Sequence, residues 1–163
     1  MLRITLLFLS LFCFDSVYAA RMGSAAPIIQ LSILNGSERG KAASLEDYKG
    51  KLVYLDFWAS WCGPCRQSLP IMNEIRNLYS DLGFEVVAVN VDEKLEDALG
   101  FLKKYPVNYP ILLDPEGKMP KAYDIKGMPT AYLISKEGKI IHEHVGFKKS
   151  DRNKIEALIK ENL

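Results

Sequence analysis

The chain has 163 residues, of which 48% are hydrophobic, and this is enough apolar material for one proper core and too little for two. We therefore expect a single domain. Its 21 basic and 20 acidic side chains give a net charge of +1, so the surface has no bias toward nucleic acid or anionic membranes, and proteins are the expected partners.

Residues 1–19 have the pattern of a secretion signal. A positive Arg3 precedes the apolar run from Ile4 to Phe14, and Val17-Tyr18-Ala19 is a small-residue cleavage pattern, so we place the cut after Ala19. An uncleaved membrane anchor is the alternative, although the apolar run is shorter than the roughly 20 residues that span a bilayer. The signal predicts export to the periplasm.

The segment that follows the signal should be irregular at first. Residues 20–26 are small and polar, and we expect a mobile lead-in there. Residues 27–34 then alternate weakly before the turn signal Asn35-Gly36, which predicts an edge strand or a hairpin. Ser44 is a good cap residue followed by two acids, so a short helix over 44–48 is expected.

A redox turn is predicted where the apolar run Leu52 to Phe57 meets a pair of cysteines and then a helical pattern. Two cysteines that are separated by two residues can close a small disulfide ring. At a helix start the first thiolate faces unpaired backbone N–H groups and the positive end of the helix dipole. Cys62 is therefore the predicted nucleophile, and Cys65, one helical turn away, can resolve a mixed disulfide. Taken alone, the pair could also be half of a zinc site or a structural disulfide.

Loss of the signal would remove Cys13 and leave the pair as the only cysteines of the mature chain, in an oxidising compartment.

The remaining elements follow from periodicity and turn residues. A helix should carry the stripe Leu69, Met72, Ile75, Tyr79 and Leu82, kinked at Pro70. Later strands are expected at 84–91, 109–113, 130–135 and 139–145, and helices at 94–105, 118–123 and 151–162, the last one capped near Ser150.

Two motifs carry a family resemblance. The run from Asp56 to Cys65 (DFWASWCGPC) closely resembles the thioredoxin active-site segment, and Gly127-Met128-Pro129-Thr130 resembles the loop of that fold in which a cis-proline faces the cysteines. The resemblance implies an α/β thioredoxin fold over residues 26–163. An N-terminal extension and a central helix–strand insertion are similar to the TlpA/ResA-like branch of exported thioredoxins.

Asp56 is the ionisable residue of the cysteine-bearing strand. An unpaired carboxylate is costly to bury, and burial would raise its pKa. An outward-facing surface aspartate is the alternative. The resemblance implies that Asp56 is the general acid/base for Cys65. The chain departs from many ResA-like proteins at Ser68, where they carry a glutamate, so a mechanism that depends on that glutamate is not carried over.

The resemblance also implies a peptide-binding surface. Trp61, Met128 and Gly146 match positions that contact substrates in thioredoxins, although Trp61 could simply pack over the turn, and Trp58 is expected in the core. Gly63, Pro64 and Pro129 complete the predicted substrate-binding set.

His142 and His144 lie two residues apart on a predicted strand, hence on one face, and could in principle bind a metal. No third ligand has a matching spacing, so we expect a solvated strand face and assign no metal. Beyond the cysteine couple, no cofactor is expected.

The family resemblance implies a periplasmic protein disulfide oxidoreductase. Gly63-Pro64 supplies no cation to stabilise the Cys62 thiolate, which favours a reductase. In the family, clients include apocytochrome c, and electrons come from a membrane thiol relay. We expect this protein to be a monomer. A copper or zinc carrier and a peroxidase are the alternatives, although the peroxiredoxin signature would need proline and threonine where this chain has Leu55 and Ala59.

Overall fold

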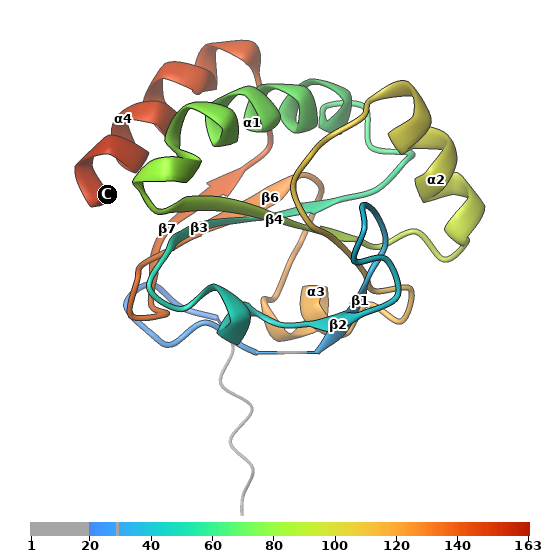
Figure 1. Cartoon of the computed structure of the whole chain (residues 1–163), viewed down its shortest axis with the longest axis horizontal. Helices are drawn as coiled ribbons and strands as arrows, with labels where there is room; N and C mark the ends of the chain where they lie inside the picture. Colours follow the sequence, from blue (N-terminus) through green and yellow to red (C-terminus); the bar gives the residue numbers. More distant parts are fainter. Residues whose placement is uncertain (1–19, 29) are drawn as a thin grey trace, which may run out of the picture.

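The computed structural model describes residues 20–28 and 30–163, and the predicted signal over residues 1–19 lies outside these ranges. Figure 1 shows a central sheet with helices on both faces. The strands of the described residues are β1 (Leu31–Ile33), β2 (Ala42–Ala43), β3 (Leu52–Trp58), β4 (Phe84–Asn90), β5 (Ile111–Leu113), β6 (Thr130–Ile134) and β7 (Ile140–Val145). The α-helices are α1 (Cys65–Tyr79), α2 (Leu95–Lys104), α3 (Lys118–Ala122) and α4 (Arg152–Asn162).

The sheet has the strand order β2-β1-β5-β4-β3-β6-β7. Strands β3, β4 and β5 run parallel, whereas β6 is antiparallel to β3. All seven residues of both β3 and β4 are buried, as expected for strands that helices cover on two faces. This is the expected mixed α/β sheet of the thioredoxin fold, and α1 connects its two central strands.

Helices α1, α2 and α4 cover one face of the sheet, and α3 lies on the other face with the 3₁₀ helix Leu45–Tyr48 (Figure 1). Two apolar clusters correspond to these faces. The first joins the stripe of α1 to Phe101 of α2, Ile155 of α4 and both cysteines. The second packs Met119 of α3 against the opposite side of β3. The cysteine pair therefore belongs to the face that α1 covers.

The N-terminal extension forms a small antiparallel ribbon on the sheet. Strand β1 pairs with β2 on one side and β5 on the other, so the hairpin interpretation is confirmed and β2, not β1, is the edge. The expected helix at 44–48 is a 3₁₀ turn. Ser44 caps it, because its side chain accepts from the N–H of Glu46 while its own N–H donates to Asp47.

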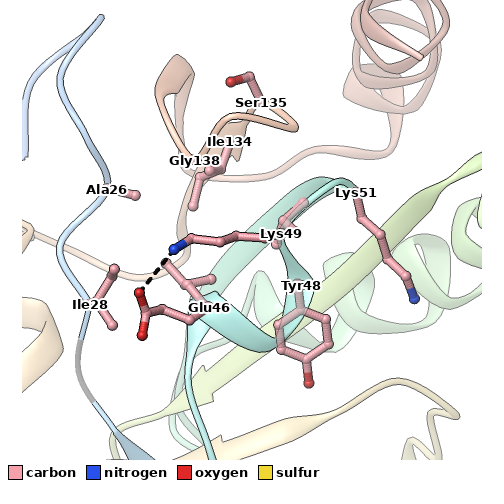
Figure 2. A pocket seen from close by; sticks show the side chains of 11 residues that line it. Ala26, Ile28, Glu46, Tyr48, Lys49, Lys51, Ile134, Ser135 and Gly138 are labelled. Carbon is pink, nitrogen blue, oxygen red and sulfur yellow. Dashed lines mark hydrogen bonds and ion pairs between the residues drawn. The ribbon is translucent and has the colours of Figure 1, made fainter.

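The expectation of a mobile lead-in is wrong. The N–H of Gly23 donates to the carbonyl of Ile140, and the N–H of Ala26 donates to the carbonyl of Gly138. Ala25 forms an isolated bridge with Lys139, so this segment is held against the start of β7. Figure 2 shows the crevice between this segment and the 3₁₀ helix, crossed by the Lys49–Glu46 ion pair. Its volume of about 30 Å³ has room for roughly two waters, so it is a packing crevice.

Two details of the helix predictions need correction. Helix α1 runs through Pro70 and ends at Tyr79, and Leu82 lies beyond it as an exposed residue of a 3₁₀ turn. Ser150 does not cap α4, because it lies within the 3₁₀ turn Lys149–Asp151 that precedes the helix. There the Asp151 carboxylate accepts from the N–H of Lys148 at 2.7 Å. Among the described residues, no helix is both long and apolar enough to cross a bilayer.

Candidate active site

The cysteines lie at the carboxyl end of β3, in the turn that starts α1. The N–H of Cys62 donates to the carbonyl of Ala59 at 3.1 Å, and Pro64 precedes the first helical residue, Cys65. No side-chain hydrogen bond caps this helix start, and the N–H groups of Arg66 and Gln67 donate to the carbonyls of Gly63 and Pro64. The N–H of Cys65 donates to Cys62 Sγ at 3.3 Å. The predicted placement of Cys62 against a helix N-terminus is therefore confirmed.

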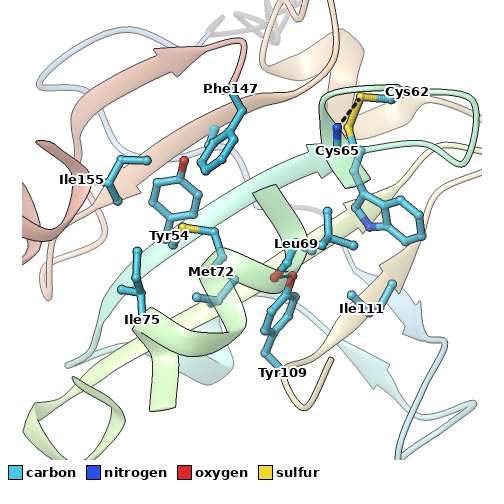
Figure 3. Close-up of a cluster of buried hydrophobic side chains, with 14 of the residues drawn as sticks. Tyr54, Cys62, Cys65, Leu69, Met72, Ile75, Tyr109, Ile111, Phe147 and Ile155 are labelled. Atoms are coloured by element: carbon cyan, nitrogen blue, oxygen red, sulfur yellow. Dashed lines mark hydrogen bonds between the residues drawn. A yellow bond between two sulfur atoms is a disulfide. The ribbon is translucent and has the colours of Figure 1, made fainter. Parts of the chain in front are cut away.

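Cys62 and Cys65 are joined by a disulfide with an S–S distance of 2.04 Å. The two cysteines differ slightly in their exposure to solvent. Cys62 is 3% exposed and Cys65 is 0% exposed, and Figure 3 shows the pair at the margin of the cluster that α1 covers. Both residues are therefore buried, and Cys62 is the less buried of the two.

A buried carboxylate fixes the loop that precedes the cysteines. Asp92 follows β4, and its side chain accepts from the Ser60 N–H at 2.9 Å and from the Ser60 hydroxyl at 2.9 Å. Asn90 donates a third hydrogen bond to it at 2.7 Å. Sequence reasoning missed this network. The sequence signal for it was a pair of polar residues where a buried strand ends, Asn90 as the last residue of β4 and Asp92 just beyond it.

Asp56 is buried, and the alternative of a surface aspartate is wrong. The side chain is 1% exposed, and Oδ2 has no hydrogen-bond partner among the described residues. Burial raises the pKa of Asp56 to about 8, because a low-dielectric surrounding disfavours the charged carboxylate. Alternation along β3 places Asp56 on the same face as Tyr54 and Trp58, which pack in one cluster with Cys65.

The second motif lies at the same end of the sheet. The Met128–Pro129 peptide bond is cis, as predicted. Thr130 pairs with Phe57 near the end of β3, and the Gly146 N–H donates to the Pro129 carbonyl at 2.8 Å. Met128 packs against the cluster that contains the cysteines. The topology thus brings the cis-proline loop and Gly146 to the edge where the redox turn lies.

Exposed apolar groups surround this edge. Trp61 is 67% exposed, so the interpretation that it only packs over the turn is wrong. Gly63 and Pro64 are exposed as well, whereas Pro129 is buried beneath the surface that it shapes. Val145, which the sequence did not point to, pairs with Thr130 and is 70% exposed. Trp58 is fully buried, as expected for a core residue.

His142 and His144 do not form a solvated strand face. They share a face of β7, as predicted, but it is the face that Ile155 and Ile159 of α4 cover. His144 Nε2 is buried 3.6 Å from Asp151 Oδ2, and burial lowers the pKa of His144 while Asp151 opposes that shift. In the described part of the chain, no group of three or more potential ligands could hold a metal.

A cysteine pair at a helix start, a cis-proline loop and a central α/β sheet together define a thioredoxin-fold thiol–disulfide oxidoreductase. The chain belongs to the Redoxin family, whose model matches residues 21–159, and it is a TlpA/ResA-like member of the thioredoxin superfamily. It is 39% identical over 132 residues to the thiol-disulfide oxidoreductase ResA of Bacillus subtilis strain 168, covering 78% of this chain and 72% of that protein.

Solved structures agree with this family. A Chlorobium tepidum structure assigned as the thiol:disulfide interchange protein DsbE has a TM-score of 0.82 and 44% identity, covering 88% of this chain and 99% of that one. The exposed lipoprotein thioredoxin Etrx1 of Streptococcus pneumoniae has a TM-score of 0.69 and 35% identity, covering 83% and 99%. The enzyme is therefore a protein disulfide oxidoreductase that acts on protein thiols.

Proposed function

We propose that this enzyme reduces disulfides of exported proteins, with Cys62 as the attacking and Cys65 as the resolving thiol. The observation that carries the assignment is the hydrogen bond from the Cys65 N–H to Cys62 Sγ. A backbone donor at a helix start stabilises a thiolate on Cys62, and Cys62 is also the less buried of the two cysteines.

The reaction is a pair of thiol–disulfide exchanges. The Cys62 thiolate attacks a client disulfide, forms a mixed disulfide and releases one client thiolate, which takes a proton from solvent. The Cys65 thiolate then attacks Cys62 Sγ, closes the Cys62–Cys65 disulfide and releases the second client thiolate. The client gains two electrons and two protons, and the enzyme dithiol becomes a disulfide.

Asp56 is proposed as the base for the second exchange. Cys65 is fully buried, so its thiol has no direct contact with solvent to which it could lose a proton. Asp56 lies on the same face of β3, and its pKa of about 8 lets it exchange a proton near neutral pH. Asp56 would accept the proton of the Cys65 thiol as this sulfur attacks.

The exposed surface around the cysteines is proposed to bind the client chain. It combines the exposed Trp61, Gly63 and Pro64 of the redox turn with the half-buried Met128 and Gly146, and the buried Pro129 supports it from beneath. Its apolar groups, with Val145 at the margin, suit an unfolded segment that carries large apolar side chains next to its cysteine.

Reduction is the favoured direction, because Gly63-Pro64 gives the thiolate no cation and a less stabilised thiolate makes the couple more reducing. We further propose that residues 1–19 are a cleaved signal and that the monomeric enzyme works in the periplasm. Similarity to the DsbE structure and to the exposed lipoprotein Etrx1 supports a place outside the cytoplasm. A membrane thiol protein is the proposed electron donor, and apocytochrome c is a proposed client.

Client trapping tests this function. A Cys65→Ser variant expressed with its signal should accumulate mixed disulfides in the periplasm, to be identified by mass spectrometry, whereas the matched Cys62→Ser variant should trap none. In vitro, Cys62→Ser should not reduce the disulfides of insulin or oxidised apocytochrome c. Equal trapping by the two variants would contradict the assigned roles.

A further inference from the structure

The ionised form of Asp56 lacks a hydrogen-bond donor. Its cross-strand neighbours are Ala88 on β4 and Ala131 on β6, and an alanine side chain cannot donate. Oδ2 is buried without a partner among the described residues. A buried carboxylate that must become charged during turnover needs such a donor, because an unpaired buried charge is costly.

Tyr109 brings a hydroxyl to this face of the sheet. Tyr109 directly precedes Pro110, whose carbonyl accepts from the Ala88 N–H at 3.0 Å, so this segment runs beside the cross-strand neighbour of Asp56. The Tyr109 side chain is buried in the cluster that holds Cys65. Its hydroxyl donates to the Leu69 carbonyl of α1 at 3.2 Å, and Figure 3 shows it directed at Leu69.

The Leu69 carbonyl gains less stabilisation from the Tyr109 hydroxyl than an ionised Asp56 carboxylate would. Leu69 lies inside α1, where helix geometry supplies its carbonyl with the N–H of Asn73. A neutral carbonyl that already accepts one bond competes poorly with an unpartnered charged carboxylate, because hydrogen bonds to ionised groups are the stronger ones. When Asp56 loses its proton, a hydrogen bond from the Tyr109 hydroxyl to its carboxylate is therefore favoured over the bond to the Leu69 carbonyl.

We propose that Tyr109 is a positioning residue for Asp56: its hydroxyl donates to the Leu69 carbonyl while Asp56 is protonated and to Asp56 Oδ2 when Asp56 is ionised. The inference rests on the proposed function, in which Asp56 accepts the Cys65 proton. It adds that the same hydroxyl links the proton acceptor to the helix that begins with Cys65.

The electrostatics of the cluster agree with this arrangement. After burial, the charge of Asp56 is the next largest cause that raises the pKa of both Tyr109 and Tyr54. Among the described residues, the ionisable groups buried in this cluster are these two tyrosines and the two cysteines, while Tyr79 and Tyr105 pack against its margin. His142 and His144 line a cavity with Tyr54, and Asp151 acts on Tyr54 from beyond the cluster. Figure 3 shows the Tyr54 hydroxyl directed toward Phe147 and Ile155, so Tyr54→Phe is a matched control.

The test is the titration of the Asp56 carboxyl carbon by ¹³C NMR in the oxidised protein, with the signal assigned by its loss in Asp56→Asn. The wild-type midpoint should lie near pH 8. Tyr109→Phe should raise the midpoint by about one pH unit, because the anion loses a hydrogen bond to a charged group. Tyr54→Phe should leave the midpoint unchanged, and thermal melts should confirm that all variants fold.

Kinetics separate this inference from the proposed function. Stopped flow measures the rate at which a preformed mixed disulfide is resolved at each pH. In Tyr109→Phe the pH midpoint of this rate should rise by the same one unit, and the rate at pH 7 should be about tenfold lower. An unchanged Asp56 midpoint in Tyr109→Phe, or an equal shift in Tyr54→Phe, overturns the role of Tyr109. A shifted midpoint with resolution rates that are the same in Asp56→Asn and wild type supports the hydrogen bond and refutes Asp56 as the base.

Discussion

Replacing Asp56 by asparagine should change how the stability of the fold depends on pH. The folded protein holds a proton on Asp56 up to a pKa of about 8, whereas the ordinary value for this carboxyl is 3.8. Between these values the native state binds more protons than the unfolded state, so stability falls as pH rises. The stability that the protonated Asp56 contributes is fully present below about pH 4 and is lost as pH rises through 8.

The size of the effect follows from the two pKa values. Each unit of difference is worth about 1.4 kcal/mol, so the free energy of unfolding should fall by about 4 kcal/mol between pH 4 and pH 7 through this one group. An asparagine has the same shape and no charge, so the variant lacks this slope. The stability difference between the two oxidised proteins should therefore widen in favour of the variant as pH rises.

Urea denaturation at intervals between pH 4 and pH 8 measures this difference. Other ionisable groups contribute equally to both proteins and cancel in the comparison, provided that the slope against urea is the same. If the free energies of unfolding of wild type and Asp56→Asn run parallel against pH across this range, the reasoning is refuted, because Asp56 would then titrate alike in the folded and unfolded chains. A variant that is less stable at every pH would show that the carboxyl makes a structural bond.

The other predictions concern three separate parts of the molecule. Arg76 forms a two-pronged ion pair with the buried Glu85 at 2.9 and 3.2 Å, so Arg76→Met should cost about 3 kcal/mol in urea melts. The matched Lys51→Met, at 3.9 Å from the same carboxylate, should cost less than about 1 kcal/mol, and equal losses would contradict the assignment. Trp61→Ala should raise KM for a protein disulfide about tenfold without changing the melting temperature, since Trp61 is exposed; a lower melting temperature would make it a packing residue. Ser44→Ala should cost about 1 kcal/mol through the lost cap of the 3₁₀ helix, and no loss on denaturation would argue against that cap.

The central β3-α1-β4 unit was predictable because its signals are local. A continuous apolar run, a stripe at helical spacing and a second apolar run each identify one element from its own residues. The cysteine pair and the cis Met128–Pro129 bond came from motifs whose spacing is short. The burial of Asp56 was also predictable, since its strand neighbours are all apolar.

What could not be predicted depends on contacts between distant residues. Period-two spacing places His142 and His144 on one face, but only the packing of α4 decides which face is buried. The bond from the Tyr109 hydroxyl to Leu69 joins residues 40 positions apart, and the Ser60–Asp92 pair joins residues 32 positions apart. No local pattern specifies such a partner, although each polar residue next to an apolar run indicates that a partner is needed.

The anchored lead-in connects the proposed signal cleavage with the fold of the mature chain. The nitrogen of Ala20 donates to the carbonyl of Ala122, the last residue of α3, at 3.2 Å. With the proposed cut after Ala19, this nitrogen becomes a free ammonium facing the Ala122 carbonyl, and a hydrogen bond from a charged donor is the stronger kind. Signal cleavage would then strengthen a bond that the uncut chain makes only with a neutral amide, so the exported form would hold its first residue more tightly than the precursor does.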